Sequence, residues 1–344
     1  MVNKQVPAVR RIIVLGTGGT IAGRSGARGD NIGYTAAQVG VAELLGDIDL
    51  PADITVHAEQ VAQIDSKDMD VVTWQRLARR CMHWLAQSDV TGIVITHGTD
   101  TLEETAFFLH LALRPHKPVV ITCAMRPASA LSPDGPQNVR DAIAVASTPG
   151  AQGVVAVCAG VVHSAIDVQK VHTYRLDAFN SGDAGPIGYV EEGDVRQLRE
   201  WPAGGTSGHT LPSAPGAIAL DPADWPRVEI LMSHAGAGAG LVDALISERR
   251  LGKPDAARGL VLAATGNGTL HHTLEAAAMR AQSAGMVVVR ATRCAQGRIL
   301  PKSGEALRDA GALTPVKARV ALMLELMGLL TLDANASGMS KDED

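Results

Sequence analysis

Two threonines among glycines follow a short apolar run near the start of the chain. The run covers residues 11–15, and the segment GTGGTIAG after it contains Thr17 and Thr20. A threonine hydroxyl can act as a nucleophile when a base lies nearby, and glycines allow a substrate or another backbone segment to approach closely. The segment matches neither the dinucleotide-binding pattern nor the lysine-containing phosphate loop. Nucleophilic catalysis and simple capping of the next helix are therefore the two interpretations that remain.

A second polar segment, HGTDTLEE, begins at His97, directly after another apolar run. Thr101 and Glu104 have the spacing of a capping box, which satisfies free N–H groups at the start of a helix. His97 is interpreted as a packed turn residue rather than as a catalytic base. Thr99 and Asp100 are not explained by capping, so they are candidates for chemistry.

The hydroxyl and carboxyl groups of both segments come at the ends of apolar runs, which predicts that they meet in the folded chain. The carboxyl ends of neighbouring parallel strands lie at one edge of a sheet, where sites form in open α/β proteins. Thr20, Thr99 and Asp100 would then supply a nucleophile, a second hydroxyl and a carboxylate. Such a set is suited to acyl transfer, which needs a nucleophile, a base and groups that stabilise an oxyanion.

The elements that must position this site alternate along the first half of the chain. Short β-branched runs, typical of buried parallel strands, occur at 11–15, 92–96, 118–123 and 153–158. Between them, apolar residues at spacings of three and four predict helices over 70–87, over 101–113 and after the sequence DGP at 134–136. The alternation predicts βαβ units and a doubly wound, mainly parallel sheet.

The second half resumes this alternation on a smaller scale after an aperiodic stretch rich in glycine and proline. Strands are predicted at 228–233, 259–265 and 286–291, and helices at 241–249, at 270–283 and from Thr314 to about Leu330. We therefore expect an N-terminal domain over 1–200, a linker over 201–226, a smaller domain over 227–333 and a flexible tail over 334–344.

The composition excludes several classes of protein. Lysine and arginine total 31 against 36 acidic residues, a net charge of −5 without a basic run, so no nucleic-acid partner is expected. Aromatic residues make up only 3 %, too few for stacking on bases. No apolar run reaches the roughly 18 residues that span a bilayer, so no membrane partner is expected. The four cysteines are widely spaced and predict buried thiols rather than a metal or redox site.

Together, the two threonine-bearing segments resemble the two signature motifs of the bacterial-type L-asparaginase family. The first is TGGTIAG at 17–23 and the second is THGTDT at 96–101. The resemblance continues through AMRP at 124–127, SPDGPQN at 132–138, DVQK at 167–170 and TPVKAR at 314–319. It implies a larger N-terminal flavodoxin-like α/β domain and a smaller C-terminal α/β domain. It also implies hydrolysis of L-asparagine to L-aspartate and ammonia through an acyl-threonine, without a metal or cofactor.

Five catalytic residues follow from the resemblance. Thr20 matches the nucleophile, and Tyr34 matches the tyrosine of a mobile lid, for which the glycine-rich, polar segment before it is suited. Thr99, Asp100 and Lys170 match the second hydroxyl, the carboxylate and the amine of the family's site. A lysine held near a carboxylate and away from bulk water can relay a proton. Without the resemblance, Lys170 would be interpreted as a solvated surface lysine.

The resemblance assigns further residues to substrate binding. Asp100 with Ser66 would hold the α-ammonium and α-carboxylate groups of the substrate, whose charges need partners once they leave water. The assigned substrate-binding positions besides Asp100 are Gly19, Asp65, Ser66, Gly98, Ala124 and Thr269.

Some positions depart from the family's pattern. Thr269 lies where an asparagine or serine of a neighbouring subunit often lines the site, and no acidic residue near Ile299 matches the carboxylate of that subunit in periplasmic members. Strict specificity for asparagine is therefore not implied. A broader glutaminase-asparaginase is the alternative, because one methylene is worth only about 1 to 3 kcal/mol in a pocket. A non-catalytic amino-acid-binding protein and a nucleotide-dependent oxidoreductase, which lacks its fingerprint here, are alternatives from other classes.

The resemblance also implies a homotetramer built from two intimate dimers, with sites between subunits. The apolar run near the start stops at Gly16 and is too short for the core of a signal peptide. Gln87 and Pro115 lie at about the places of the cysteine pair that bridges some periplasmic members. The missing pair favours the cytoplasm, although a periplasmic protein whose signal peptide has been removed would have the same features.

Overall fold

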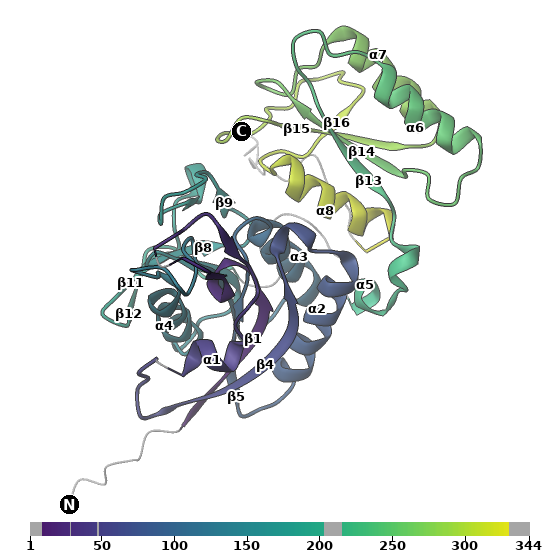
Figure 1. Ribbon diagram of the computed structural model, residues 1–344. Helices are drawn as coiled ribbons and strands as arrows, with labels where there is room; N and C mark the ends of the chain where they lie inside the picture. The colour runs from purple at the N-terminus through teal and green to yellow at the C-terminus, as the bar shows by residue number, and fades with distance from the viewer. Residues whose placement is uncertain (1–8, 28, 47, 203–214, 330–344) are drawn as a thin grey trace, which may run out of the picture. The chain divides into compact units, whose positions relative to one another are not determined.

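The computed structural model describes residues 9–27, 29–46, 48–202 and 215–329 and divides the chain into two compact units, Met1–Gly204 and Gly205–Asp344 (Figure 1). Each unit contains its own sheet and its own hydrophobic core. The predicted tail at 334–344 and residues 203–214 of the predicted linker lie outside the described residues. The rest of that linker range includes two short helical segments, α5 (Pro215–Ala219) and η4 (Pro222–Asp224).

An eight-stranded sheet forms the centre of the first unit, in the order β12-β11-β8-β7-β6-β5-β1-β4. Strands β4, β1, β5, β6 and β7 pair in parallel, and β8, β11 and β12 extend the sheet through antiparallel pairs. The strands are β1 (Arg10–Gly18), β4 (Ile54–Ile64), β5 (Val90–Thr96), β6 (Pro118–Thr122), β7 (Gly153–Cys158), β8 (Val161–Ser164), β11 (Gly188–Glu191) and β12 (Asp194–Gln197). The predicted α/β class with one large sheet is confirmed.

The parallel half of this sheet is buried on both faces. Residues of β5, β6 and β7 are almost all buried, which explains the continuous β-branched runs in the sequence. Helices α1 (Val41–Leu45) and α4 (Gly135–Ala146) pack on the face that carries Ile12 and Val14. Because side chains alternate along a strand, Ile13 and Leu15 face the other side. Helices α2 (Val71–Leu85) and α3 (Leu102–Leu113) cover that side (Figure 1).

Four strands of the eight-stranded sheet are missing from the sequence prediction. Edge strand β4 buries few of its side chains, so its sequence has no continuous apolar run. Strands β8, β11 and β12 have four residues each, too few for a periodic signal. The hairpins β7-β8 and β11-β12 turn at Ala159-Gly160 and Glu192-Gly193, where both residues have positive φ. Alanine and glutamate are uncommon at the first position of such turns, so the sequence does not indicate them.

The second unit contains a four-stranded parallel sheet in the order β13-β14-β15-β16. Its elements are β13 (Val228–Met232), α6 (Gly240–Arg250), β14 (Gly259–Ala264), α7 (His272–Ser283), β15 (Val287–Thr292), β16 (Arg308–Asp309) and α8 (Pro315–Leu326). The Thr314 side chain caps α8 by accepting from the N–H of Lys317, as the sequence predicts. The helix ends about four residues before the prediction because Gly328, with a φ of 73°, terminates it.

The carboxyl ends of β1 and β5 meet because the two strands are parallel neighbours, with Gly16 paired to Thr96. Gly19 then lies directly on the backbone of Gly98, so that a Cβ on Gly19 would overlap the nitrogen and Cα of Gly98. A Cβ on Gly98 would in turn overlap the side chain of Ser66. The glycines of both motifs therefore allow three loops to come into contact.

We expect Gly19→Ala to destabilise the protein more than Gly193→Ala does. Both glycines have a left-handed φ, 81° and 88°, so both substitutions carry a backbone penalty, and the penalty is larger at Gly19, whose ψ of −169° lies in a region that is essentially limited to glycine. Nothing lies within 4 Å of a Cβ at Gly193, whereas a Cβ at Gly19 overlaps Gly98. The melting temperature should fall by about 2–4 °C for Gly193→Ala and by at least twice as much for Gly19→Ala. Equal losses would show that the two loops are not in contact.

Candidate active site

Thr20 and Tyr34 form one half of the candidate site. Thr20 begins the 3₁₀ turn η1 (Thr20–Ala22), directly after Gly19, and only 7 % of its surface is exposed. Its Oγ1 lies 2.7 Å from the phenolic oxygen of Tyr34. Tyr34 lies in β3 (Tyr34–Thr35), which pairs with β2 (Arg24–Ser25) in a small antiparallel hairpin. The Thr20 hydroxyl therefore bonds to another side chain, and its interpretation as a helix cap is wrong.

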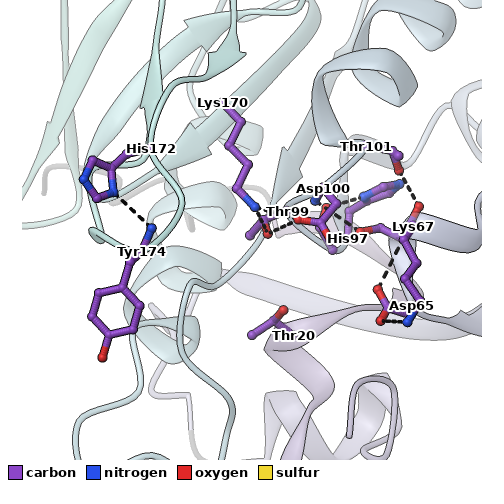
Figure 2. A network of polar contacts seen from close by, with 12 residues as sticks. Thr20, Asp65, Lys67, His97, Thr99, Asp100, Thr101, Lys170, His172 and Tyr174 are labelled. Carbon is purple, nitrogen blue, oxygen red and sulfur yellow. Dashed lines mark hydrogen bonds and ion pairs between the residues drawn. The ribbon is translucent and has the colours of Figure 1, made fainter. Parts of the chain in front are cut away.

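Lys170 organises the other half of the site. It lies in β9 (Gln169–Lys170), and its Nζ donates to Thr99 Oγ1 at 2.8 Å and to Asp100 Oδ1 at 2.6 Å (Figure 2). The Lys170 side chain is 20 % exposed, against 53 % for Asp100. Its interpretation as a solvated surface lysine is therefore wrong. Figure 2 shows Thr20 beside this network, on a separate loop and without a direct hydrogen bond to it.

This arrangement can move a proton. A charged lysine has only donors, so the oxygen of Thr99 accepts from Lys170 while its own hydroxyl donates to Asp100 Oδ1 at 3.4 Å. An uncharged Lys170 would instead take that proton and leave Thr99 able to accept one from a water molecule or from Thr20. Asp100 balances the positive charge that this transfer creates on the amine.

Ser66 connects the loop after β5 to a third segment. It begins the turn η2 (Ser66–Asp68), is 3 % exposed, and its Oγ accepts from the backbone N–H of Asp100 at 3.2 Å. Its carbonyl accepts from Thr101 Oγ1 at 2.8 Å. Thr101 is the N-cap of α3 but makes no side-chain capping bond, so the capping role predicted for its hydroxyl is wrong: that hydroxyl is already bonded to Ser66. Asp65, which caps η2, forms an ion pair with Lys67 at 2.8 Å.

His97 lies in the same loop but takes no direct part in this network. It is fully buried, and its Nδ1 donates to the carbonyl of Gly98 at 2.7 Å. Burial lowers the pKa of His97 to about 4, so the imidazole is neutral near pH 7. A neutral, packed ring of this kind supports the turn, in agreement with the sequence interpretation.

Ala124 follows β6 and is fully buried, with its backbone fixed on both sides. The carboxylate of Asp134 accepts from the N–H groups of Met125 and Arg126 at 2.9 and 3.0 Å. Asn138 donates to the carbonyl of Cys123 at 2.9 Å and accepts from the N–H of Ala159 at 3.0 Å. Asp134 and Asn138 therefore position this strand end. The sequence reasoning assigned them no role, although both lie in the motif at 132–138.

Thr269 belongs to the second unit, and its place in the site stays a prediction. It is exposed, and its Oγ1 lies 2.9 Å from that of Thr265 in a two-residue bridge. Gly268, with a φ of 83°, packs against the buried side chain of Ile299. The Thr269 hydroxyl can exchange this internal bond for a contact with a substrate at low cost, because it is already open to solvent.

The described part of the chain shows where the four cysteines lie and whether its side chains or helices could hold a metal ion or span a membrane. Cys81, Cys123 and Cys158 are buried free thiols, as predicted, whereas Cys294 is exposed and corrects that prediction. Among residues 9–27, 29–46, 48–202 and 215–329, no group of three or more His, Cys, Asp or Glu side chains is arranged to hold a metal ion. No helix within these ranges is long and apolar enough to span a membrane.

Comparison with known sequences covers nearly the whole chain. The model of the asparaginase N-terminal domain matches residues 11–203, and that of the glutaminase/asparaginase C-terminal domain matches residues 227–333. L-asparaginase 2 of Bacillus subtilis is 38 % identical over 94 % of this chain and 84 % of its own length. Glutaminase-asparaginase of Pseudomonas fluorescens is 33 % identical over 92 % of this chain and 86 % of its own.

Comparison with solved structures gives the same result. A crystal structure described as a probable cytoplasmic L-asparaginase from Campylobacter jejuni matches with a TM-score of 0.84 and 33 % identity, over 94 % of this chain and 97 % of that one. The match includes both units, each with the sheet described above. The two domain matches, the identities and the shared fold show that this chain belongs to the asparaginase family.

Proposed function

We propose that this chain is an amidohydrolase that converts L-asparagine to L-aspartate and ammonia through an ester on Thr20. The observation that carries the proposal is the Lys170 amine, which contacts both Thr99 and Asp100 beside the loop of Thr20. Two hydroxyls, an amine and a carboxylate are the groups that acyl transfer requires. The relatives named L-asparaginase and glutaminase-asparaginase support this substrate class.

In the first half-reaction, Thr20 Oγ1 attacks the side-chain amide carbon of the substrate. Its proton passes to the hydroxyl of Tyr34, its hydrogen-bond partner at 2.7 Å, and the proton of Tyr34 passes on towards the leaving nitrogen. The carbon–nitrogen bond breaks, the amide nitrogen takes up a proton, and ammonia leaves. The aspartyl group stays attached to Thr20 as an ester.

In the second half-reaction, a water molecule attacks the carbonyl carbon of this ester. Thr99 accepts a proton from the water and passes its own to the uncharged amine of Lys170, to which it is bonded at 2.8 Å. The ester bond breaks, Thr20 regains its proton, and L-aspartate leaves. Asp100 and Ser66 hold the α-ammonium and α-carboxylate groups in both steps, with Asp65, Gly19, Gly98 and Ala124 around them.

The family resemblance also suggests an oligomeric state, a cellular location and a second candidate function. We propose a homotetramer, in which Thr269 of one subunit reaches the site of a neighbour. We also propose a cytoplasmic location, as the name of the Campylobacter jejuni structure states for that protein; the name of a Haemophilus influenzae relative states a periplasmic one. A glutaminase-asparaginase is the second candidate function, because Thr269 offers a hydroxyl where an amide is common in the family.

Thr20→Ala should abolish hydrolysis and leave the fold intact, because a methyl group cannot form the ester. We expect at least about a 10³-fold loss of kcat for L-asparagine, measured by ammonia release from the folded variant. Thr17→Val is the matched control: it removes the other hydroxyl of this loop, which donates to the carbonyl of Thr96, and should retain most activity. Retention of more than a tenth of wild-type activity by Thr20→Ala would refute the nucleophile assignment.

Lys170→Met should lower kcat for L-asparagine far more than it lowers the melting temperature. The substitution keeps most of the side-chain volume and removes the amine that contacts Thr99 and Asp100. Lys117→Met serves as the control and should keep its kcat. It removes an amine that donates to the carbonyl of Gln87 at the amino ends of the parallel strands, away from the candidate site. If activity and stability fall in parallel in Lys170→Met, the lysine is a structural ion-pair partner and not a proton relay.

Thr269→Asn should raise the ratio of asparaginase to glutaminase efficiency. In the wild-type protein, a hydroxyl makes fewer contacts to the α-ammonium group than an amide would, so glutamine should be hydrolysed measurably but less efficiently than asparagine. Discrimination by one methylene alone is limited to about 10- to 200-fold. Side-by-side kcat/KM values for both amides test this. A wild-type protein without glutaminase activity, or an unchanged ratio in the variant, would show that Thr269 does not determine specificity.

A further inference from the structure

Lys67 places a positive charge next to the candidate substrate site. It is the middle residue of η2, directly after the buried Ser66, whose hydroxyl accepts from the N–H of Asp100. Its Nζ lies 2.8 Å from Oδ2 of Asp65, and its side chain is 64 % exposed. Figure 2 shows Lys67 and Asp65 on the side of the network opposite Lys170, with Asp100 between them. The ammonium group is therefore exposed to solvent and lies beside Asp65, on the turn that carries Ser66.

Both carboxylates assigned to the substrate are already paired with lysines. Asp100 contacts Lys170 at 2.6 Å, and Asp65 contacts Lys67 at 2.8 Å. The hydrogen bond to Asp65 raises the pKa of Lys67 above its usual value, and the negative charges of Asp68 and Asp100 raise it further. Lys67 therefore stays charged at neutral pH and interacts electrostatically with Asp100.

These pairs affect the two charged groups of an amino-acid substrate in opposite ways. An α-ammonium group binds well to a carboxylate that has no cation of its own, and the charge of Lys67 weakens that attraction at Asp65 and, from farther away, at Asp100. An α-carboxylate, in contrast, is attracted by the positive charge of Lys67, which lies on the same turn as Ser66. The site therefore favours the carboxylate of the substrate more than its ammonium group.

We propose that Lys67 is a specificity-determining residue that weakens the requirement for an α-ammonium group, so that ω-amides with a carboxylate and no ammonium are also substrates. Succinamate, which is asparagine without its amino group, is the simplest of these. Its hydrolysis consumes one water and gives succinate and ammonia by the same two acyl-transfer steps. This inference rests on the proposed amidohydrolase function.

The test is the ratio of kcat/KM for L-asparagine to kcat/KM for succinamate, measured by ammonia release. Lys67→Gln removes the positive charge and should raise this ratio about two- to fivefold, since an exposed charge acts through water. Asp65→Asn leaves Lys67 without its partner and should lower the ratio. Lys117→Gln removes a lysine charge at the amino ends of the parallel strands, away from the candidate site, and should leave the ratio unchanged.

Ionic strength separates an electrostatic effect from a change in shape. Salt screens exposed charges. The asparagine-to-succinamate ratio of Lys67→Gln should therefore approach that of the wild-type protein in about 0.5 M NaCl. A ratio in Lys67→Gln that equals the wild-type ratio, or a difference that salt does not reduce, overturns the inference. The same holds for a wild-type protein that hydrolyses asparagine but not succinamate. A folded wild-type protein that hydrolyses neither amide overturns the proposed function as well.

Discussion

Two glycine backbones touch at the carboxyl edge of β1 and β5, and the reactive side chains are arranged around that contact. Gly19 precedes Thr20, and Gly98 precedes Thr99, so the approach of the two backbones brings the two hydroxyl-bearing loops together. A side chain at either glycine would separate the loops, because its Cβ would overlap the facing segment. The parallel pairing of β1 with β5 brings the two loops together, and glycine at positions 19 and 98 allows the contact without steric overlap.

The amine of Lys170 comes from the segment that follows the antiparallel strand β8. After β7, the chain reverses through Ala159-Gly160 into β8 and reaches Lys170 on β9. A lysine from this distant segment then contacts Thr99 and Asp100, which belong to the parallel half. Paired charges recur around the site, in Lys170 with Asp100 and in Lys67 with Asp65. Such pairing keeps the site close to neutral, which suits a zwitterionic or singly charged substrate.

Elements with a strong local signal could be predicted, and those without one could not. Buried β5, β6 and β7 have continuous β-branched sequences, and α2 has an apolar stripe behind the cap Asp70. Strand β4 lacked a signal because it lies at the edge, and β8, β11 and β12 because they are short. At the site, residues in the two glycine-rich motifs could be assigned, whereas the positioning roles of Asp134 and Asn138 depend on contacts with other strand ends.

The sequence by itself determined the α/β class, the family resemblance and the identity of the candidate reactive residues, because glycine spacing, β-branched runs and motifs are local properties. Only the tertiary structure decided what each side chain does. Thr101 fits a capping box by spacing, yet its hydroxyl donates to Ser66. Lys170 has the sequence surroundings of a surface lysine, yet it is mostly buried against Thr99, 71 residues away. The physical reason is that hydrogen-bond partners distant in sequence are selected by strand pairing and packing, which no local pattern encodes.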